Sequence, residues 1–156
     1  QDITVSGACF ARLDLPPANV FITENEINFL TFPRHPQSMV IFGAGYGFDI
    51  LRQASWLHNC KIHYWGDIDT HGFAILNQLR QHFPTAGSFL MDRPTLLAHQ
   101  KFWGKEPQPV KADLARLTDA ELSVFNDLRY NTLGEQLRLE QERIGFSWVK
   151  EKLEQQ

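Results

Sequence analysis

The sequence has little cysteine, no long apolar run and no block of basic residues. Its two cysteines, Cys9 and Cys60, show no metal-ligand or redox spacing, so we interpret them as reduced thiols of a cytoplasmic protein. No apolar run approaches the roughly 20 residues that span a bilayer, and no signal-like segment opens the chain. The net charge is −3, without the basic stripe of a domain that holds nucleic acid by itself. If the protein acts on DNA, we expect other domains or subunits to supply much of the phosphate binding.

The bulk composition predicts one globular domain. The chain has 156 residues, of which 43% are hydrophobic and 21% are charged, close to the averages for globular proteins. It begins with Gln rather than Met, so we expect a domain cut from a longer protein. Within it we predict a lead-in over residues 1–18, an α/β core over residues 19–103 and a helical extension of the same domain over residues 104–156.

Strands and helices alternate through the first half of the chain. The predicted strands are Asn19–Thr23, Ser38–Phe42, Lys61–Trp65 and Ser88–Met91. The predicted helices are Glu24–Leu30, Phe48–His58 and Phe73–His82. Alternation through short connections predicts a mostly parallel four-stranded sheet with flanking helices. Residues Ile3–Ser6 alternate weakly and suggest a further short edge strand.

The pattern changes after residue 92. Residues 104–113 are rich in Pro, Lys and Gly and predict a loop. Thr118-Asp-Ala-Glu121 has the form of a capping box and predicts the start of a helix. The remainder, to Gln156, has the pattern of polar helix that packs on the sheet.

Three acidic residues follow two of the predicted strands. Asp67 and Asp69 come directly after Lys61–Trp65, and Glu24 follows Asn19–Thr23. Residues i and i+2 of an extended backbone point to the same side, and the carboxyl ends of parallel strands meet at one edge of a sheet. Carboxylate oxygens suit Mg²⁺ and Mn²⁺, which polarise phosphoryl oxygens and deliver water nucleophiles. The sequence therefore predicts a divalent-metal site for chemistry on phosphates.

Other interpretations of these motifs stay open. Asp69 also suits the cap of a helix that begins near His71. The segment Gly43-Ala-Gly-Tyr-Gly47 after a strand suggests a dinucleotide-binding turn, and hence a nicotinamide- or flavin-dependent oxidoreductase with a ribose on Asp67. However, Phe48 stands where the third glycine of G-x-G-x-x-G belongs. The Asp-x-Asp pair also resembles the Asp-x-Asp-x-Thr motif of haloacid-dehalogenase-type phosphatases, but His71 stands at the position of the threonine.

Several motifs in order resemble a known family. Val20-Phe-Ile-Thr-Glu24 and Gly66–Leu76 resemble the first strand, the glutamate and the Asp-x-Asp segment of the TOPRIM domain, especially the topoisomerase VI A-subunit form, Asp-x-Asp-Pro-Tyr-Gly. A closer resemblance is to the C-terminal domain of the JetD family, the nucleases of Wadjet plasmid defence. The segments that carry it are Ile22–Glu26, Phe42–Gly47, Tyr64–Gly72 and Arg138–Ile144. The resemblance covers roughly residues 19 to 149.

The resemblance implies a TOPRIM (Rossmann-like) fold and an endonuclease that cleaves plasmid DNA with Mg²⁺ or Mn²⁺. Glu24, Asp67 and Asp69 match the family's catalytic metal ligands. Expected partners are DNA, SMC-like subunits of the defence complex and a second copy of the chain, with N-terminal arm and winged-helix-like regions outside this sequence. Topoisomerase relatives cut with a tyrosine outside the TOPRIM domain. No tyrosine here matches it, so we assign no covalent nucleophile.

Further polar residues near these motifs have two interpretations each. His71 is a candidate to contact metal-bound water or phosphate, or simply a polar residue at a helix start. Glu26 is a candidate to hydrogen-bond the groups around the metal ion or to bind a second metal ion, or it is simply exposed. The segment with Glu140 and Glu142 matches the family's motif, but polar helix with nearby arginines indicates surface ion pairs. A TOPRIM-like module that binds DNA or a partner without cutting is the remaining alternative.

Overall fold

The computed structural model describes residues 3–14, 17–43 and 48–156. Its strands are β1 (Asn19–Thr23), β2 (Ser38–Phe42), β3 (Lys61–Trp65), β4 (Gly87–Ser88), β5 (Gly104–Lys105) and β6 (Leu137–Arg138). Its α-helices are α1 (Gly7–Ala11), α2 (Glu26–Leu30), α3 (Asp49–Gln53), α4 (Thr70–His82), α5 (Arg93–Ala98), α6 (Asp119–Arg129) and α7 (Phe146–Leu153). Its short 3-10 turns are η1 (Ser55–Asn59), η2 (Gln100–Phe102) and η3 (Gln141–Arg143).

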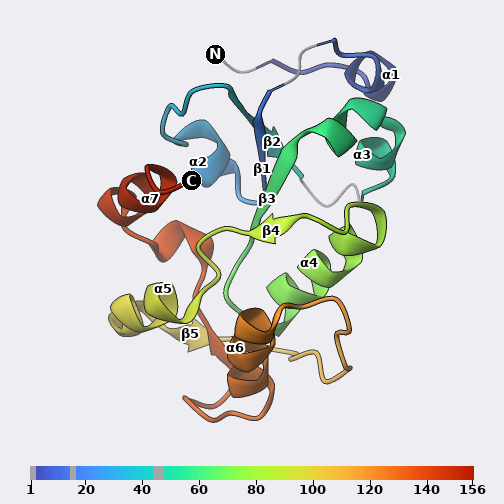
Figure 1. Ribbon diagram of the computed structural model, residues 1–156. Helices are drawn as coiled ribbons and strands as arrows, with labels where there is room; N and C mark the ends of the chain where they lie inside the picture. Colours follow the sequence, from blue (N-terminus) through green and yellow to red (C-terminus); the bar gives the residue numbers. More distant parts are fainter. Residues whose placement is uncertain (1–2, 15–16, 44–47) are drawn as a thin grey trace.

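Four parallel strands of the described residues form the central sheet, in the order β2-β1-β3-β4. The register places Thr23, the last residue of β1, opposite both Phe42 and Trp65, the last residues of its neighbours. The carboxyl ends of β1, β2 and β3 are therefore level, and the chain leaves all three at one edge of the sheet (Figure 1). The predicted α/β class with a parallel four-stranded sheet and flanking helices, a Rossmann-like or TOPRIM-type arrangement, is confirmed.

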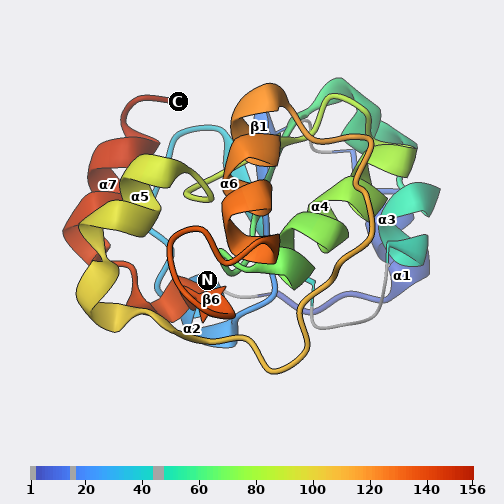
Figure 2. The ribbon, with the colours of Figure 1, turned by 90° about the horizontal axis from the view of Figure 1, so that it is seen from below.

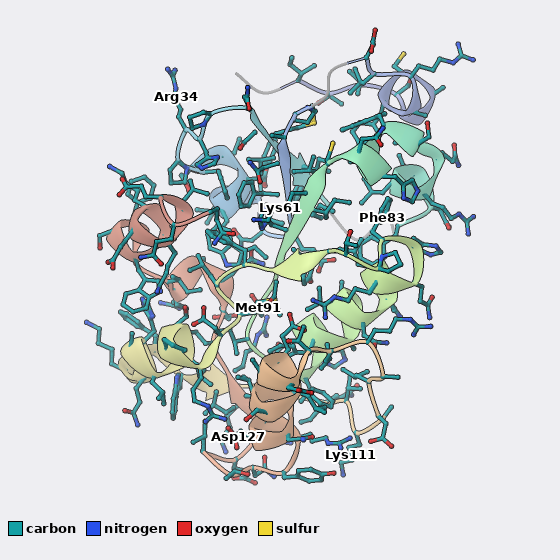
Figure 3. All side chains as sticks on the ribbon, viewed as in Figure 1. Arg34, Lys61, Phe83, Met91, Lys111 and Asp127 are labelled. Atoms are coloured by element: carbon teal, nitrogen blue, oxygen red, sulfur yellow. The ribbon has the colours of Figure 1, made fainter. Side chains whose placement is uncertain are left out.

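Helices cover both sides of the sheet. Helices α2, α5 and α7 lie on one side, and α1, α3 and α4 lie on the other, as the two views agree (Figures 1 and 2). Central strands enclosed in this way bury side chains on both faces and are expected to be continuously apolar. Strand β1 meets this expectation, because Val20, Phe21 and Ile22 are all at most 1% exposed. Met91 lies in the interior, whereas Arg34 projects from the surface (Figure 3).

The first half departs from the sequence predictions in three places. Residues Ile3–Ser6 form no strand in the described part of the chain, and helix α1 follows them. The predicted helix Phe48–His58 is interrupted at Ala54, whose φ and ψ of −90° and 86° end α3 before the 3-10 turn η1. The predicted strand Ser88–Met91 is reduced to two residues of β4, because Leu90 turns the chain with a φ of 58°.

The second half is less helical than predicted. The capping box at the start of α6 is confirmed, since Thr118 and Glu121 each accept the other's backbone N–H. Asn131 and Gln136 then adopt φ values of 57° and 51°, a left-handed conformation that α-helix does not allow. The chain continues as β6, which pairs with β5, before η3 and α7. None of the helices that the structure describes is long and apolar enough to cross a membrane.

Candidate active site

The three predicted acids line one depression at the carboxyl edge of the sheet. Glu24 is the first residue after β1, and Asp67 and Asp69 lie just after β3, its neighbour in the sheet. All three border a depression of about 540 Å³. Two parallel strands with level ends bring these carboxylates to one place, as the sequence predicted.

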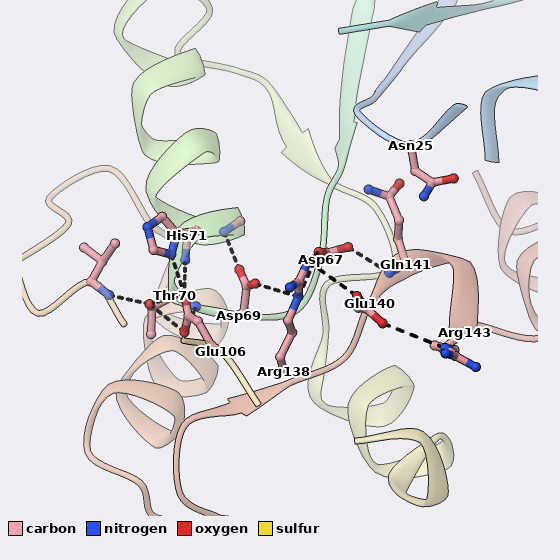
Figure 4. Close-up of polar contacts among 12 residues, drawn as sticks. Asn25, Asp67, Asp69, Thr70, His71, Glu106, Arg138, Glu140, Gln141 and Arg143 are labelled. Carbon is pink, nitrogen blue, oxygen red and sulfur yellow. Dashed lines mark hydrogen bonds and ion pairs between the residues drawn. The ribbon is translucent and has the colours of Figure 1, made fainter. Parts of the chain in front are cut away.

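Asp67 is held by hydrogen bonds to both of its carboxylate oxygens. Its Oδ1 accepts the backbone N–H of Gln141 at 2.9 Å. Its Oδ2 accepts from Nη2 and Nε of Arg138 at 2.5 and 3.2 Å (Figure 4). Both donors come from β6 and the residues that follow it, more than 70 residues further along the chain. The position of this carboxylate is therefore set by tertiary structure.

Asp69 is a helix cap and a site carboxylate at once. Its Oδ1 accepts the backbone N–H of Gly72 at 2.7 Å and caps the N-terminus of α4. Its Oδ2 lies 3.3 Å from Nε of Arg138 and borders the depression. Gly72 is required for this tight turn, since a Cβ there would lie 2.1 Å from the carbonyl oxygen of Asp67. The two interpretations of Asp69 from sequence are thus compatible.

Burial and neighbouring carboxylates raise the pKa of Glu24 and of Asp69. Burial, and then the charges of Asp67 and Asp69, raise the pKa of Glu24 above its ordinary 4.5. Burial is also the main reason why the pKa of Asp69 rises from 3.8 to about 6, against the hydrogen bond from Gly72. Glu106 and Asp67 raise it further, and Arg138 lowers it. The raised pKa values of Glu24 and Asp69 therefore report burial first, and then the nearby carboxylates, whose effect on Asp69 the guanidinium of Arg138 opposes.

Tyr64 lies beneath the acids with an unpaired hydroxyl group. Its side chain is fully buried, and its Oη has no hydrogen-bond partner among the described residues, while Tyr64 is one of the residues that line the depression. Burial and the charges of Glu24, Asp67 and Asp69 raise its pKa well above 10. A Cβ at Gly66 would lie 2.5 Å from this hydroxyl oxygen, so glycine is needed where the chain leaves β3. The Tyr64 hydroxyl is therefore a neutral O–H group that can donate a hydrogen bond to a ligand, a water molecule or a carboxylate.

The segment from Arg138 to Glu142 completes the site, which corrects the sequence interpretation. We expected polar helix with surface ion pairs. The ion pairs of Glu140 with Arg138 and Arg143 are present, but β6 and η3 replace the helix and cross the ends of β1 and β3. The Oε1 atom of the buried Gln141 accepts a hydrogen bond from the hydroxyl group of Thr23 at 2.6 Å. Sequence reasoning missed Gln141, and the only signal for it was the resemblance of this segment to a family motif.

Glu106 was missed entirely by sequence reasoning, yet it fixes the start of α4. Only 2% exposed, it accepts the N–H of Thr70 at 3.2 Å and that of His71 at 3.1 Å. It also accepts the Thr70 hydroxyl at 2.7 Å and lies 2.6 Å from Nδ1 of His71 (Figure 4). An acid within a Pro- and Lys-rich loop carried no recognisable pattern, because its partners lie about 35 residues away.

The structure separates the two supporting candidates. His71 borders the depression, with its imidazole half-exposed and held by Glu106. Glu26 is exposed in the first turn of α2 and does not border the depression. The glycine-rich loop offered for a dinucleotide lies mostly outside the described residues, which end at Gly43 and resume at Phe48.

The donor set suits a hard divalent ion, although it is not preassembled around one. Within the described residues, no three His, Cys, Asp or Glu side chains are arranged to hold a metal ion as they stand. Instead, the guanidinium of Arg138 contacts two of the acids. The acids offer only oxygen atoms, which Mg²⁺ and Mn²⁺ prefer, and they carry more negative charge than one arginine neutralises. Charge and donor type therefore fit a divalent ion.

Comparison with known proteins shows the family. No curated protein matches this chain. The family model described as "Wadjet protein JetD, C-terminal" matches residues 1–153, nearly the whole sequence. The match spans the Glu24 segment, the Asp67–Asp69 segment and the Arg138–Glu142 segment that meet in the depression. On this evidence, the chain belongs to the family of the C-terminal region of the Wadjet protein JetD.

Proposed function

We propose that this chain is the catalytic TOPRIM domain of a DNA endonuclease that depends on Mg²⁺ or Mn²⁺ and cleaves plasmid DNA in Wadjet defence. The observation that carries the proposal is the excess of carboxylates over cations where β1 and β3 end. Membership of the JetD family supports it at the level of the family.

Glu24, Asp67 and Asp69 would hold the metal ion. When bound to such carboxylates, a divalent ion supplies Lewis-acid stabilisation of phosphate charge and lowers the pKa of water. The protein supplies orientation: the N–H of Gln141 fixes Asp67, and the N–H of Gly72 fixes Asp69. Tyr64 and the buried ends of β1 and β3 close the depression from below, which strengthens electrostatic interactions within it.

The test is cleavage of closed plasmid DNA by the intact protein, with and without Mn²⁺. Glu24→Ala and Asp67→Ala should each reduce cleavage by about a thousandfold, since metal binding contributes several kcal/mol to the barrier. Glu151→Ala is the matched control, because Glu151 is exposed on α7 away from the depression. Circular dichroism checks that each variant folds.

The same assay separates the alternatives. A module that binds DNA without cutting would show no Mn²⁺-dependent cleavage in the wild type. Near-normal cleavage by both Glu24→Ala and Asp67→Ala would locate the reaction elsewhere and refute the metal-site assignment.

A further inference from the structure

Arg138 occupies the place where a cation is expected. Its Nη2 lies 2.5 Å from Oδ2 of Asp67, and its Nε lies 3.3 Å from Oδ2 of Asp69. Glu140 is a weaker third partner, at 3.7 Å from Nη2. One guanidinium thus joins two of the proposed metal ligands (Figure 4).

The same side chain is placed to meet a phosphate. Arg138 is the only Arg or Lys among the described residues that border the depression. Its backbone is held in β6 by pairing with Gly104, whereas its side chain is 31% exposed. Arginine binds phosphate oxygens through two parallel N–H groups, and its long side chain reorients without movement of the backbone.

A divalent ion and this guanidinium cannot both keep the same carboxylate oxygens. Removal of Arg138 would leave the acids with uncompensated negative charge, which attracts a divalent ion more strongly. Retention of Arg138 weakens metal binding but provides a positive charge for an anionic substrate that approaches an acidic surface.

We infer that Arg138 is a built-in counter-ion that competes with the divalent ion for Asp67 and Asp69, and that its released guanidinium binds the phosphate of the DNA. The inference rests on the proposed function. It adds a substrate-binding residue, and an exchange of partners, to the three acids.

Metal affinity tests the first half without any substrate. Calorimetric titration of the chain with Mn²⁺ alone should show about tenfold tighter binding by Arg138→Gln than by the wild type, because one nearby positive charge is lost. Arg143→Gln is the matched control, because it removes the same charge from an exposed side chain that forms an ion pair with Glu140 at 3.8 Å. It should bind within about twofold of the wild type, since exposed pairs contribute little.

The outcomes of the titration distinguish competition by Arg138 from the existence of the metal site itself. Equal or weaker Mn²⁺ binding by Arg138→Gln overturns the competition, while the proposed metal site stands if the wild type binds. If neither the wild type nor Arg138→Gln binds Mn²⁺, the proposed function and this inference fall together. Misfolding cannot imitate the expected result, because an unfolded variant does not gain affinity.

Plasmid cleavage by the intact protein at saturating Mn²⁺ tests the second half. Arg138→Gln should lower kcat/KM by about tenfold to a hundredfold, since a charge-assisted contact to phosphate is lost. Arg138→Lys should recover part of it, and Arg143→Gln should cleave normally. Cleavage by Arg138→Gln equal to the wild type would show that the guanidinium does not bind the substrate phosphate.

Discussion

Two clusters in this molecule each pair an arginine with carboxylates, but the pKa of the acid is lowered in one cluster and raised in the other. Arg80 and Glu121 form a two-pronged pair at 2.5 and 2.9 Å, with both side chains under 10% exposed. Nε and Nη1 of this arginine also donate to the carbonyl oxygens of Ala86 and Arg116. Burial alone raises the pKa of Glu121, but its hydrogen bonds, first of all from Arg80, outweigh burial and lower it.

The cluster around Arg138 is not balanced in this way. One guanidinium faces Asp67, Asp69 and Glu140, and Glu24 also borders the depression. The pKa of Asp69 rises to about 6 in spite of the arginine, and that of Glu24 rises as well. A structural ion pair neutralises its acid and lowers the acid's pKa. In the cluster around Arg138, burial and then the surplus carboxylates keep the pKa of Asp69 and Glu24 raised, and the surplus negative charge retains the capacity to bind another cation.

Removal of Arg80, whose charge is matched by that of Glu121, should have the largest effect on stability. Arg80→Ala leaves Glu121 buried without its counter-ion, so we expect the free energy of unfolding to fall by about 3 to 5 kcal/mol. Urea denaturation measures it. Arg138→Gln, from the acid-rich cluster, should lower it by less than about 1 kcal/mol, because the acids there are already incompletely paired. Similar losses in the two variants would contradict the distinction between the clusters.

Loss of Glu106 should have the next largest effect. Its carboxylate accepts hydrogen bonds from Thr70 and His71 in a buried position, and Glu106→Ala leaves these donors unpaired. We expect a loss of about 2 to 3 kcal/mol in the free energy of unfolding. Glu135→Ala is the control, because Glu135 forms an exposed ion pair with Lys105. A loss below about 1 kcal/mol in Glu106→Ala would show that the start of α4 does not depend on this acid.

The two clusters should also respond to pH in opposite directions. The folded-state pKa of Asp69, about 6, lies above its ordinary 3.8. Its contribution to stability is therefore complete below about pH 4 and is lost as the pH rises through 6. Glu121 has a lowered pKa, so its contribution is present above its ordinary 4.5 and is lost as the pH falls through its folded-state value.

Asp69→Asn makes this difference measurable. In metal-free buffer at pH 7, the variant should be more stable than the wild type by about 1 kcal/mol. The upper limit is about 3 kcal/mol, which corresponds to the rise in the pKa of Asp69 from 3.8 to about 6. Its amide oxygen can still cap α4, as Asn and Asp cap about equally well. Urea denaturation between pH 4 and pH 7 should show a flatter profile than in the wild type. An unchanged profile would contradict the raised pKa of Asp69.

Addition of metal ions should change stability by a similarly small amount, and the effect should be confined to the acid-rich cluster. An ion at ten times its Kd stabilises the folded form by about 1.4 kcal/mol, which corresponds to a rise in Tm of a few degrees. Differential scanning calorimetry with millimolar Mn²⁺ should show this rise in the wild type. Arg80→Ala should show the same rise from a lower Tm, and Asp69→Asn should lose most of it. Equal rises in all three proteins would reject Asp69 as a ligand.

Local patterns predicted the sheet and part of the site. The residues of β1, β2 and β3 match the predicted strands, because each is a short run rich in β-branched and aromatic residues between turn residues, a pattern that needs no distant information. The convergence of Glu24 with Asp67 and Asp69 followed from parallel neighbours whose ends are level. Patterns failed where one residue breaks an element, as Ala54 does before η1 and Asn131 does after α6.

The sequence by itself determined which strands form, and therefore which acids lie at the edge of the sheet. Only the tertiary structure decided what surrounds these acids. Arg138 and Gln141 reach Asp67 across more than 70 residues, and Glu106 reaches Thr70 across 36. Contacts of this kind depend on where loops and short strands pack, whereas the pattern that predicts a strand is read from residues close together in the sequence. The number of counter-ions at the site, and hence its pKa values and its capacity for a cation, is therefore a property of the folded chain.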